Sequence, residues 1–114
     1  MIQEFRRARR RNVPEPVAVM DTFTDQLVGR LGNVSESGML LLASAPVVED
    51  AIYQLRFHLR LGGGREVPID VGAHVLWMAD ANTPGQGFAG LRFLTIEPAS
   101  LETLRAWVNA PGTA

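Results

Sequence analysis

The sequence has no cysteine and no lysine, and only 7% of its 114 residues are aromatic. The absence of cysteine excludes disulfide bonds, thiolate metal sites and a thiol nucleophile. No apolar run reaches the roughly 18 residues that a membrane-spanning helix requires, and no apolar core of a secretory signal follows Met1. We therefore expect a cytoplasmic protein without a membrane span.

Positive charge is concentrated in one segment. All 11 basic residues are arginine, and five of them lie within positions 6–11. The formal net charge of −1 hides this asymmetry, because the rest of the chain has six arginines against 12 acidic residues. A protein that binds nucleic acid spreads its basic residues over a face. Concentration in one segment instead favours a localised anion site, and we expect no nucleic-acid partner.

The pattern of apolar residues predicts a mainly β fold. Period-two alternation indicates about six strands in hairpin succession, and helical spacing after Pro98 indicates one C-terminal helix. Such strands close into a small barrel or pack as a sandwich, with the helix over one opening or edge. Gly29 and Gly32 mark bulges or close approaches, and Ser100 is the expected helix cap. The expected strands span residues 17–23, 27–34, 39–42, 52–61, 67–77 and 88–96, and the helix ends at 108.

The chain divides into an N-terminal arm and one compact domain. Residues 1–16, which we call the arm, are expected to form a flexible, arginine-rich segment with a switch loop. They contain few apolar residues and end in a stiff Pro-Glu-Pro spacer. Residues 17–110 form the expected barrel and helix, and residues 111–114 a tail.

The chain shows no catalytic or metal-binding constellation. His58 and His74 lie on expected strands without a carboxylate at ligand spacing, so we interpret both as structural and predict no metal site. No nucleophile–base pair can be assembled, and an enzyme is not expected. Trp107 has the helical spacing of a core residue, and Trp77 is expected in the barrel wall.

Three small polar residues, Asn33, Ser35 and Gly38, lie between two apolar segments. Alone, they are typical of a polar turn between strands. A tight connection at this point would display Asn33 and Ser35 at the barrel edge. Gly38 would there allow a positive φ or a close backbone approach to a ligand. We call these three residues the Asn-Ser-Gly motif.

The arginine run contains the spacing RxxxR twice, in Arg6 with Arg10 and in Arg7 with Arg11. Together with the [D/N]xSxxG spacing of the Asn-Ser-Gly motif downstream, it resembles the PilZ domain family. The strand pattern, Trp77 before a turn and the closing helix extend this resemblance over nearly the whole chain. Which of the two arginine registers is used stays open.

The resemblance implies a six-stranded antiparallel PilZ-like β-barrel with a C-terminal α-helix, which binds the bacterial second messenger cyclic di-GMP and needs no cofactor. In that family the arginines grip phosphates and guanine edges. Asn33 would then hydrogen-bond a guanine edge, Ser35 a phosphate or its own turn, and Gly38 would permit close packing. Arg9 and Trp77 are further candidates for a place beside the ligand.

The function that follows is a cyclic di-GMP-binding effector or sensor. Its arm would become ordered on ligand binding and alter contacts with an unidentified protein partner in bacterial motility, biofilm or exopolysaccharide control. One alternative is a PilZ-like adaptor that acts through protein contacts with pilus or flagellar machinery. Another is a small barrel that binds RNA or single-stranded DNA, which usually interleaves aromatic and basic residues on a strand face. We expect a monomer or a weak homodimer.

Overall fold

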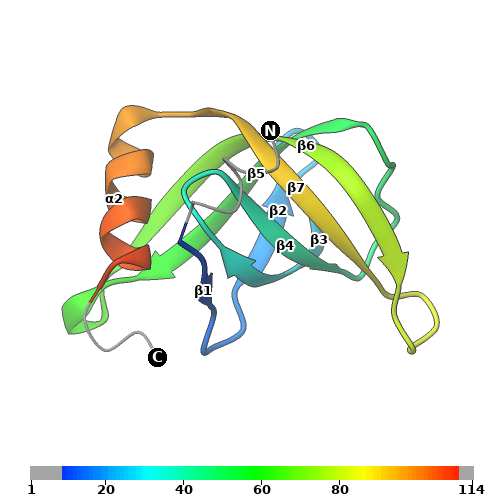
Figure 1. Cartoon of the computed structure of the whole chain (residues 1–114), viewed down its shortest axis with the longest axis horizontal. Helices are drawn as coiled ribbons and strands as arrows, with labels where there is room; N and C mark the ends of the chain where they lie inside the picture. Colours follow the sequence, from blue (N-terminus) through cyan, green and yellow to red (C-terminus); the bar gives the residue numbers. More distant parts are fainter. Residues whose placement is uncertain (1–8, 111–114) are drawn as a thin grey trace.

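The computed structural model describes residues 9–110, so Arg6, Arg7 and the tail 111–114 lie outside the described residues. Within this range the chain forms one antiparallel sheet and one C-terminal α-helix (Figure 1). The elements are β1 (Arg11–Asn12), β2 (Ala18–Asp21), β3 (Gln26–Val34), β4 (Gly38–Ala43), β5 (Ile52–Arg60), η1 (Gly62–Gly64), β6 (Glu66–Asp80), β7 (Gly87–Ile96) and α2 (Pro98–Val108).

The sheet closes on itself to form a six-stranded barrel. Its strand order is β1-β3-β2-β5-β6-β7-β4. A further pairing of β3 with β4 joins the first and last of the six strands from β3 to β4 in this order and closes the ring. Closure leaves few free backbone edges, which stabilises short strands. The predicted six-stranded barrel with a C-terminal helix is confirmed. The two-residue β1, which the sequence did not predict, adds to the outside of this ring on β3.

The core follows from strand alternation. Leu55, Phe57 and Leu59 of β5 point inward and are at most 1% exposed, and Ile69 and Val71 of β6 face them from the neighbouring strand. Burial of one such side chain contributes about 1.5–3 kcal/mol. The barrel interior is therefore a packed apolar core.

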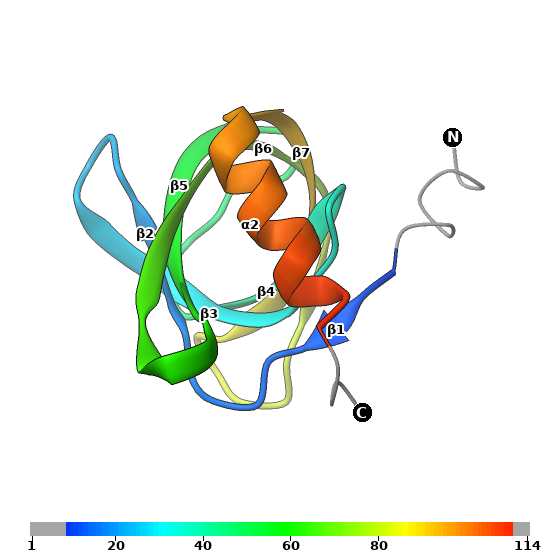
Figure 2. The ribbon, with the colours of Figure 1, turned by 90° about the vertical axis from the view of Figure 1, so that its left-hand side faces the viewer.

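Helix α2 covers one end of the barrel (Figure 2). Its buried face carries Leu104, Trp107 and Val108, so the prediction of Trp107 as a core residue is confirmed. The expectation that Ser100 caps the helix is wrong. The N-cap is Glu97, and Pro98 occupies the first turn, where its missing N–H costs no intrahelical hydrogen bond.

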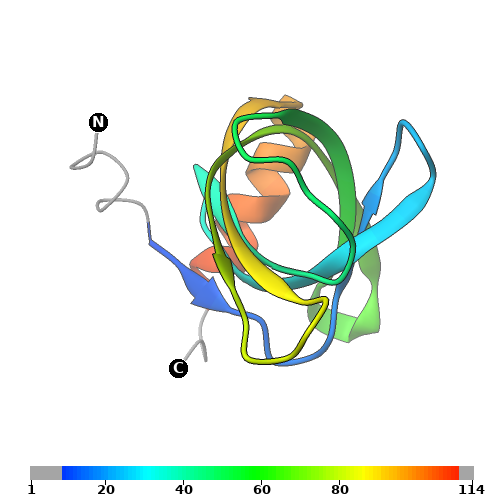
Figure 3. The same ribbon diagram turned by 90° about the vertical axis from the view of Figure 1, so that its right-hand side faces the viewer.

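Two strand ends differ from the expected ones. Strand β2 stops at Asp21 because its Oδ1 accepts the N–H groups of Phe23 (2.8 Å) and Thr24 (3.3 Å), which folds the chain into a turn. At the end of the barrel away from α2, β6 extends to Asp80 and forms a long hairpin with β7 (Figure 3). Over residues 9–110 the structure contains no helix long and apolar enough to cross a membrane.

Candidate functional site

A bulge in β3 turns Asn33 outward. Leu31 pairs with Leu41 and Asn33 with Leu40, so Gly32 is an extra residue without an opposite partner. Because the inserted residue reverses the alternation, Val34 is fully buried while Asn33 remains partly exposed. The sequence prediction of a bulge at Gly32 is confirmed, and the bulge places the Asn33 amide on the outside of the barrel.

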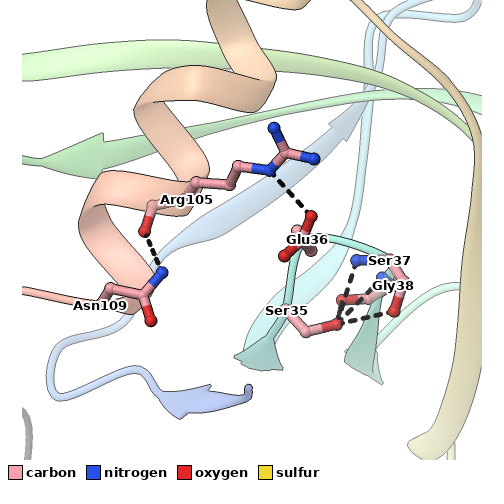
Figure 4. Close-up of polar contacts among 6 residues, drawn as sticks. All are labelled: Ser35, Glu36, Ser37, Gly38, Arg105 and Asn109. Carbon is pink, nitrogen blue, oxygen red and sulfur yellow. Dashed lines mark hydrogen bonds and ion pairs between the residues drawn. The ribbon is translucent and has the colours of Figure 1, made fainter. Parts of the chain in front are cut away.

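Ser35 organises the turn that joins β3 to β4 (Figure 4). Its side chain is fully buried, and its Oγ accepts the N–H groups of Ser37 and Gly38, both at 3.2 Å. The Ser35 N–H in turn donates to the Gly38 carbonyl at 2.9 Å. These bonds satisfy backbone groups that would otherwise be orphaned at the strand ends. The turn is thus held rigidly by the hydroxyl of Ser35.

Gly38 permits a close approach between two strands. Its φ lies outside the left-handed region, so a positive φ is not the reason for glycine here. A Cβ at this position would lie 2.3 Å from the carbonyl oxygen of Leu91 on β7. No side chain fits at that distance. The sequence predicts a positive φ or a close approach as the reason for glycine at position 38. The structure shows a close approach, and the approaching group is the backbone of β7.

Arg10 lies directly against the Asn-Ser-Gly motif. Its Nε donates to Asn33 Oδ1 at 2.9 Å, and its Nη1 donates to Ser35 Oγ at 3.4 Å. Burial lowers the pKa of the Arg10 guanidinium from its ordinary value, although arginine remains protonated at neutral pH. The arm and the motif, 23 residues apart in sequence, thus meet in one place and put a cation at the barrel edge.

The two neighbouring arginines point elsewhere, to the C-terminal end of α2. Arg11 donates from Nη1 to the Trp107 carbonyl at 2.7 Å, and its Cζ lies 4.0 Å from the centroid of the Trp107 ring. Arg9 donates to Asn109 Oδ1 at 3.4 Å. A cation is favourable at the negative end of a helix and over an indole face. The arm is consequently attached to the motif through Arg10 and to the helix through Arg9 and Arg11.

A contact that sequence reasoning missed ties the motif turn to α2. Arg105 Nε lies 2.8 Å from Glu36 Oε1 (Figure 4). Glu36 occupies one of the unspecified positions within the motif spacing, and its partner is 69 residues away in sequence. Because of this separation, no short-range spacing in the sequence could have predicted the ion pair. It places a second arginine close to the Asn-Ser-Gly motif.

Trp77 shares an outer surface with the motif. Asn33 pairs with Leu40, Leu40 with Gly90 and Gly90 with Trp77, so these four residues form a row across β3, β4, β7 and β6. The indole lies over Gly90, where any Cβ would collide with it. Trp77 is 45% exposed, which agrees with its predicted place in the barrel wall. Three strand spacings, roughly 14 Å, separate it from Asn33.

Taken together, the fold and this edge define a small antiparallel barrel, closed by one helix, with arginines gathered around a polar turn. A family model confirms the sequence resemblance. The chain belongs to the PilZ domain family, whose model matches residues 4–110. No curated protein matches the chain.

Solved structures of bacterial proteins show the same fold. The inhibitor of motility MotI/DgrA of Bacillus subtilis superimposes with a TM-score of 0.71 at 12% identity, over 89% of this chain and 48% of that protein. The PilZ domain of YcgR from Escherichia coli with c-di-GMP gives 0.64 at 15% identity, over 90% and 87%. YcgR in complex with c-di-GMP gives 0.67 at 20% identity, over 90% and 43%. The chain thus spans about half the length of MotI/DgrA.

Proposed function

We propose that this chain is a cyclic di-GMP receptor that binds its ligand at the edge formed by the arm and the Asn-Ser-Gly motif. The observation that carries the proposal is the pair of hydrogen bonds from Arg10 to Asn33 and Ser35. These bonds connect the two halves of the expected site. Family membership and the fold shared with the YcgR structures that contain c-di-GMP support the same assignment.

Each proposed ligand residue has a chemical role. A guanidinium presents a planar fork that fits phosphate oxygens and the Hoogsteen edge of guanine. Arg10 takes this role first, together with Arg6, which stands four residues before it in the RxxxR spacing. Asn33 binds a guanine edge, and Ser35 holds the turn beneath it. Arg7, Arg11 and Arg9 remain secondary candidates, as does Trp77 for stacking.

The proposed response is a change in the order of the arm. Closely spaced guanidinium groups repel one another, and the two phosphates of the ligand neutralise that repulsion. The ligand then strengthens the attachment of the arm to the barrel that Arg10 already makes beside Asn33, and the altered surface recruits or releases a protein partner in the cytoplasm. The fold shared with MotI/DgrA, an inhibitor of motility, supports motility control as the output.

Calorimetric titration with cyclic di-GMP tests the binding step. The wild-type chain is expected to bind selectively over GTP and a short oligonucleotide, and binding should survive moderate salt. Steep loss with salt and no preference among the three would instead indicate generic polyanion binding. A stable chain that does not bind would favour the adaptor function, which depends on protein contacts alone.

Hydrogen exchange over residues 1–16 tests the response separately. Protection of the arm is expected to rise when cyclic di-GMP is added, with little change in the buried strands β5 and β6 as an internal reference. Equal protection of the arm with and without ligand would contradict the order transition while leaving the binding proposal intact.

A further inference from the structure

Strand β7 runs directly beside the motif turn. Gly38 of the motif pairs with Arg92 of β7, and the Phe93 N–H donates to the Ser37 carbonyl at 2.9 Å. A Cβ on Gly38 would lie only 3.4 Å from the Arg92 Cα. Arg92 therefore begins next to the glycine of the motif, on the side opposite to β3 and the arm.

The Arg92 side chain points out of the barrel. Leu91 is 1% exposed and faces the core, and alternation along β7 turns Arg92 to the outer surface, where it is exposed. Its register partners on the two flanking strands are Gly38 and His74, neither of them acidic. His74 Nε2 lies 2.6 Å from Asp50 Oδ1, and Glu36 of the motif turn is paired with Arg105.

Three other arginines of the barrel and helix have an acidic partner, whereas Arg92 has none among the described residues. Arg56 pairs with Asp70, Arg60 with Glu66 and Glu15, and Arg105 with Glu36. Within residues 9–110, no ion pair or side-chain hydrogen bond involves Arg92. With respect to the described residues, its guanidinium is therefore an exposed cation without an acidic partner, beside a polar turn.

Gly38 lies between Arg92 and Ser35, the motif residue that Arg10 contacts. Gly38 contributes no side chain to this stretch of β4, which is bordered by the partly exposed Leu40 and by the Trp77 indole over Gly90. Two strand spacings, about 10 Å, separate the strand of Asn33 from that of Arg92. A cyclic dinucleotide held by Arg10 would extend over this floor toward Arg92.

We propose that Arg92 is a further ligand-binding residue of this chain, which grips a phosphate or a guanine edge from the side opposite to Arg10. This inference rests on the proposed binding of cyclic di-GMP. Arg92 on β7 would add a second positive charge to the binding site, opposite to the Arg10 guanidinium of the arm. A guanidinium that binds in a bidentate or stacked manner cannot be replaced by lysine without loss.

Calorimetric titration of cyclic di-GMP into the wild-type chain and the variants Arg92→Ala, Arg92→Lys and Arg65→Ala tests the proposal. Arg65 is the matched control, because it is also exposed but lies between β5 and β6, neither of which pairs with the motif strands β3 and β4. Arg92→Ala is expected to raise Kd by about tenfold to a hundredfold, the loss typical of a charge-assisted hydrogen bond. Arg92→Lys should give an intermediate loss, and Arg65→Ala should change Kd less than about twofold.

The outcomes separate this inference from the proposed function. Wild-type binding with Arg92→Ala unchanged would overturn the role of Arg92 and leave the receptor function standing. Equal losses in Arg92→Ala and Arg65→Ala would also overturn it, because only overall charge would then matter. No binding by the wild-type chain would refute both. Thermal unfolding of each variant confirms that the exposed substitutions leave the fold unchanged.

Discussion

Replacing Gly38 by alanine tests whether the motif glycine serves the contact between β4 and β7. The added Cβ would lie 2.3 Å from the Leu91 carbonyl oxygen, which belongs to the backbone and cannot rotate away. Restoring an ordinary contact requires the two strands to separate by about 1 Å. Because β4 closes the barrel between β3 and β7, this separation loosens the closure itself.

The cost follows from known effects of overpacking. Forcing an extra methyl group into a close-packed contact typically costs about 1–3 kcal/mol. We expect Gly38→Ala to lower the free energy of unfolding by about 2 kcal/mol, which corresponds to roughly 10 °C in Tm for a domain of this size. Urea denaturation followed by circular dichroism measures the free energy, and a thermal scan measures Tm.

Gly62→Ala is the matched control. A Cβ added to Gly62 would have no atom within 4 Å, and this residue does not have a positive φ. Its replacement should leave stability unchanged or raise it slightly through the unfolded state. If Gly38→Ala were as stable as Gly62→Ala, the close approach of the two strands would not explain the glycine. Direct contact of Gly38 with the ligand would then be the remaining explanation.

Three further predictions concern the polar contacts of the site. Ser35→Ala should lower the free energy of unfolding by about 1–3 kcal/mol, since two backbone N–H groups lose their acceptor; urea denaturation measures this, and wild-type stability would contradict it. Arg10→Ala should weaken cyclic di-GMP binding by about tenfold or more, and Arg11→Ala much less, in calorimetry; the reverse order would assign the other arginine register. A double-mutant cycle of Glu36→Gln and Arg105→Gln should give a coupling energy below about 1 kcal/mol that fades in high salt, because both side chains are about half exposed; a larger coupling that resists salt would show a pair shielded from solvent.

The barrel was predictable because its strands alternate cleanly in sequence. Leu55, Phe57 and Leu59 show the period of a half-buried strand, and the structure buries all three. Strand ends were less predictable, since a side chain decides them. The Asp21 carboxylate ends β2 by binding two backbone N–H groups, and nothing in the apolar pattern marks that position.

The site was predictable in its parts and not in its connections. The two spacings together, through their resemblance to the PilZ family, singled out the Asn-Ser-Gly motif and the arginine run. The choice between Arg10 and Arg11 as the residue against the motif depends on Trp107, which is 96 residues from Arg11 and attracts it to α2. The two-residue β1 has no periodicity to detect, and the placement of Arg92 depends on a register that only the closed barrel defines.

The alternating contacts of Arg9, Arg10 and Arg11 have a consequence for insertions and deletions. Consecutive residues of an extended segment face opposite ways. A shift of the arm by one position would therefore bring different residues to the amide of Asn33 and to the indole of Trp107. In most sequences the residues brought to these two places by the shift would lack a guanidinium group. A shift that brings Arg9 to Asn33 and Arg10 to Trp107 still supplies a guanidinium group at both places, so the arm tolerates a shift in that direction that a more varied segment would not.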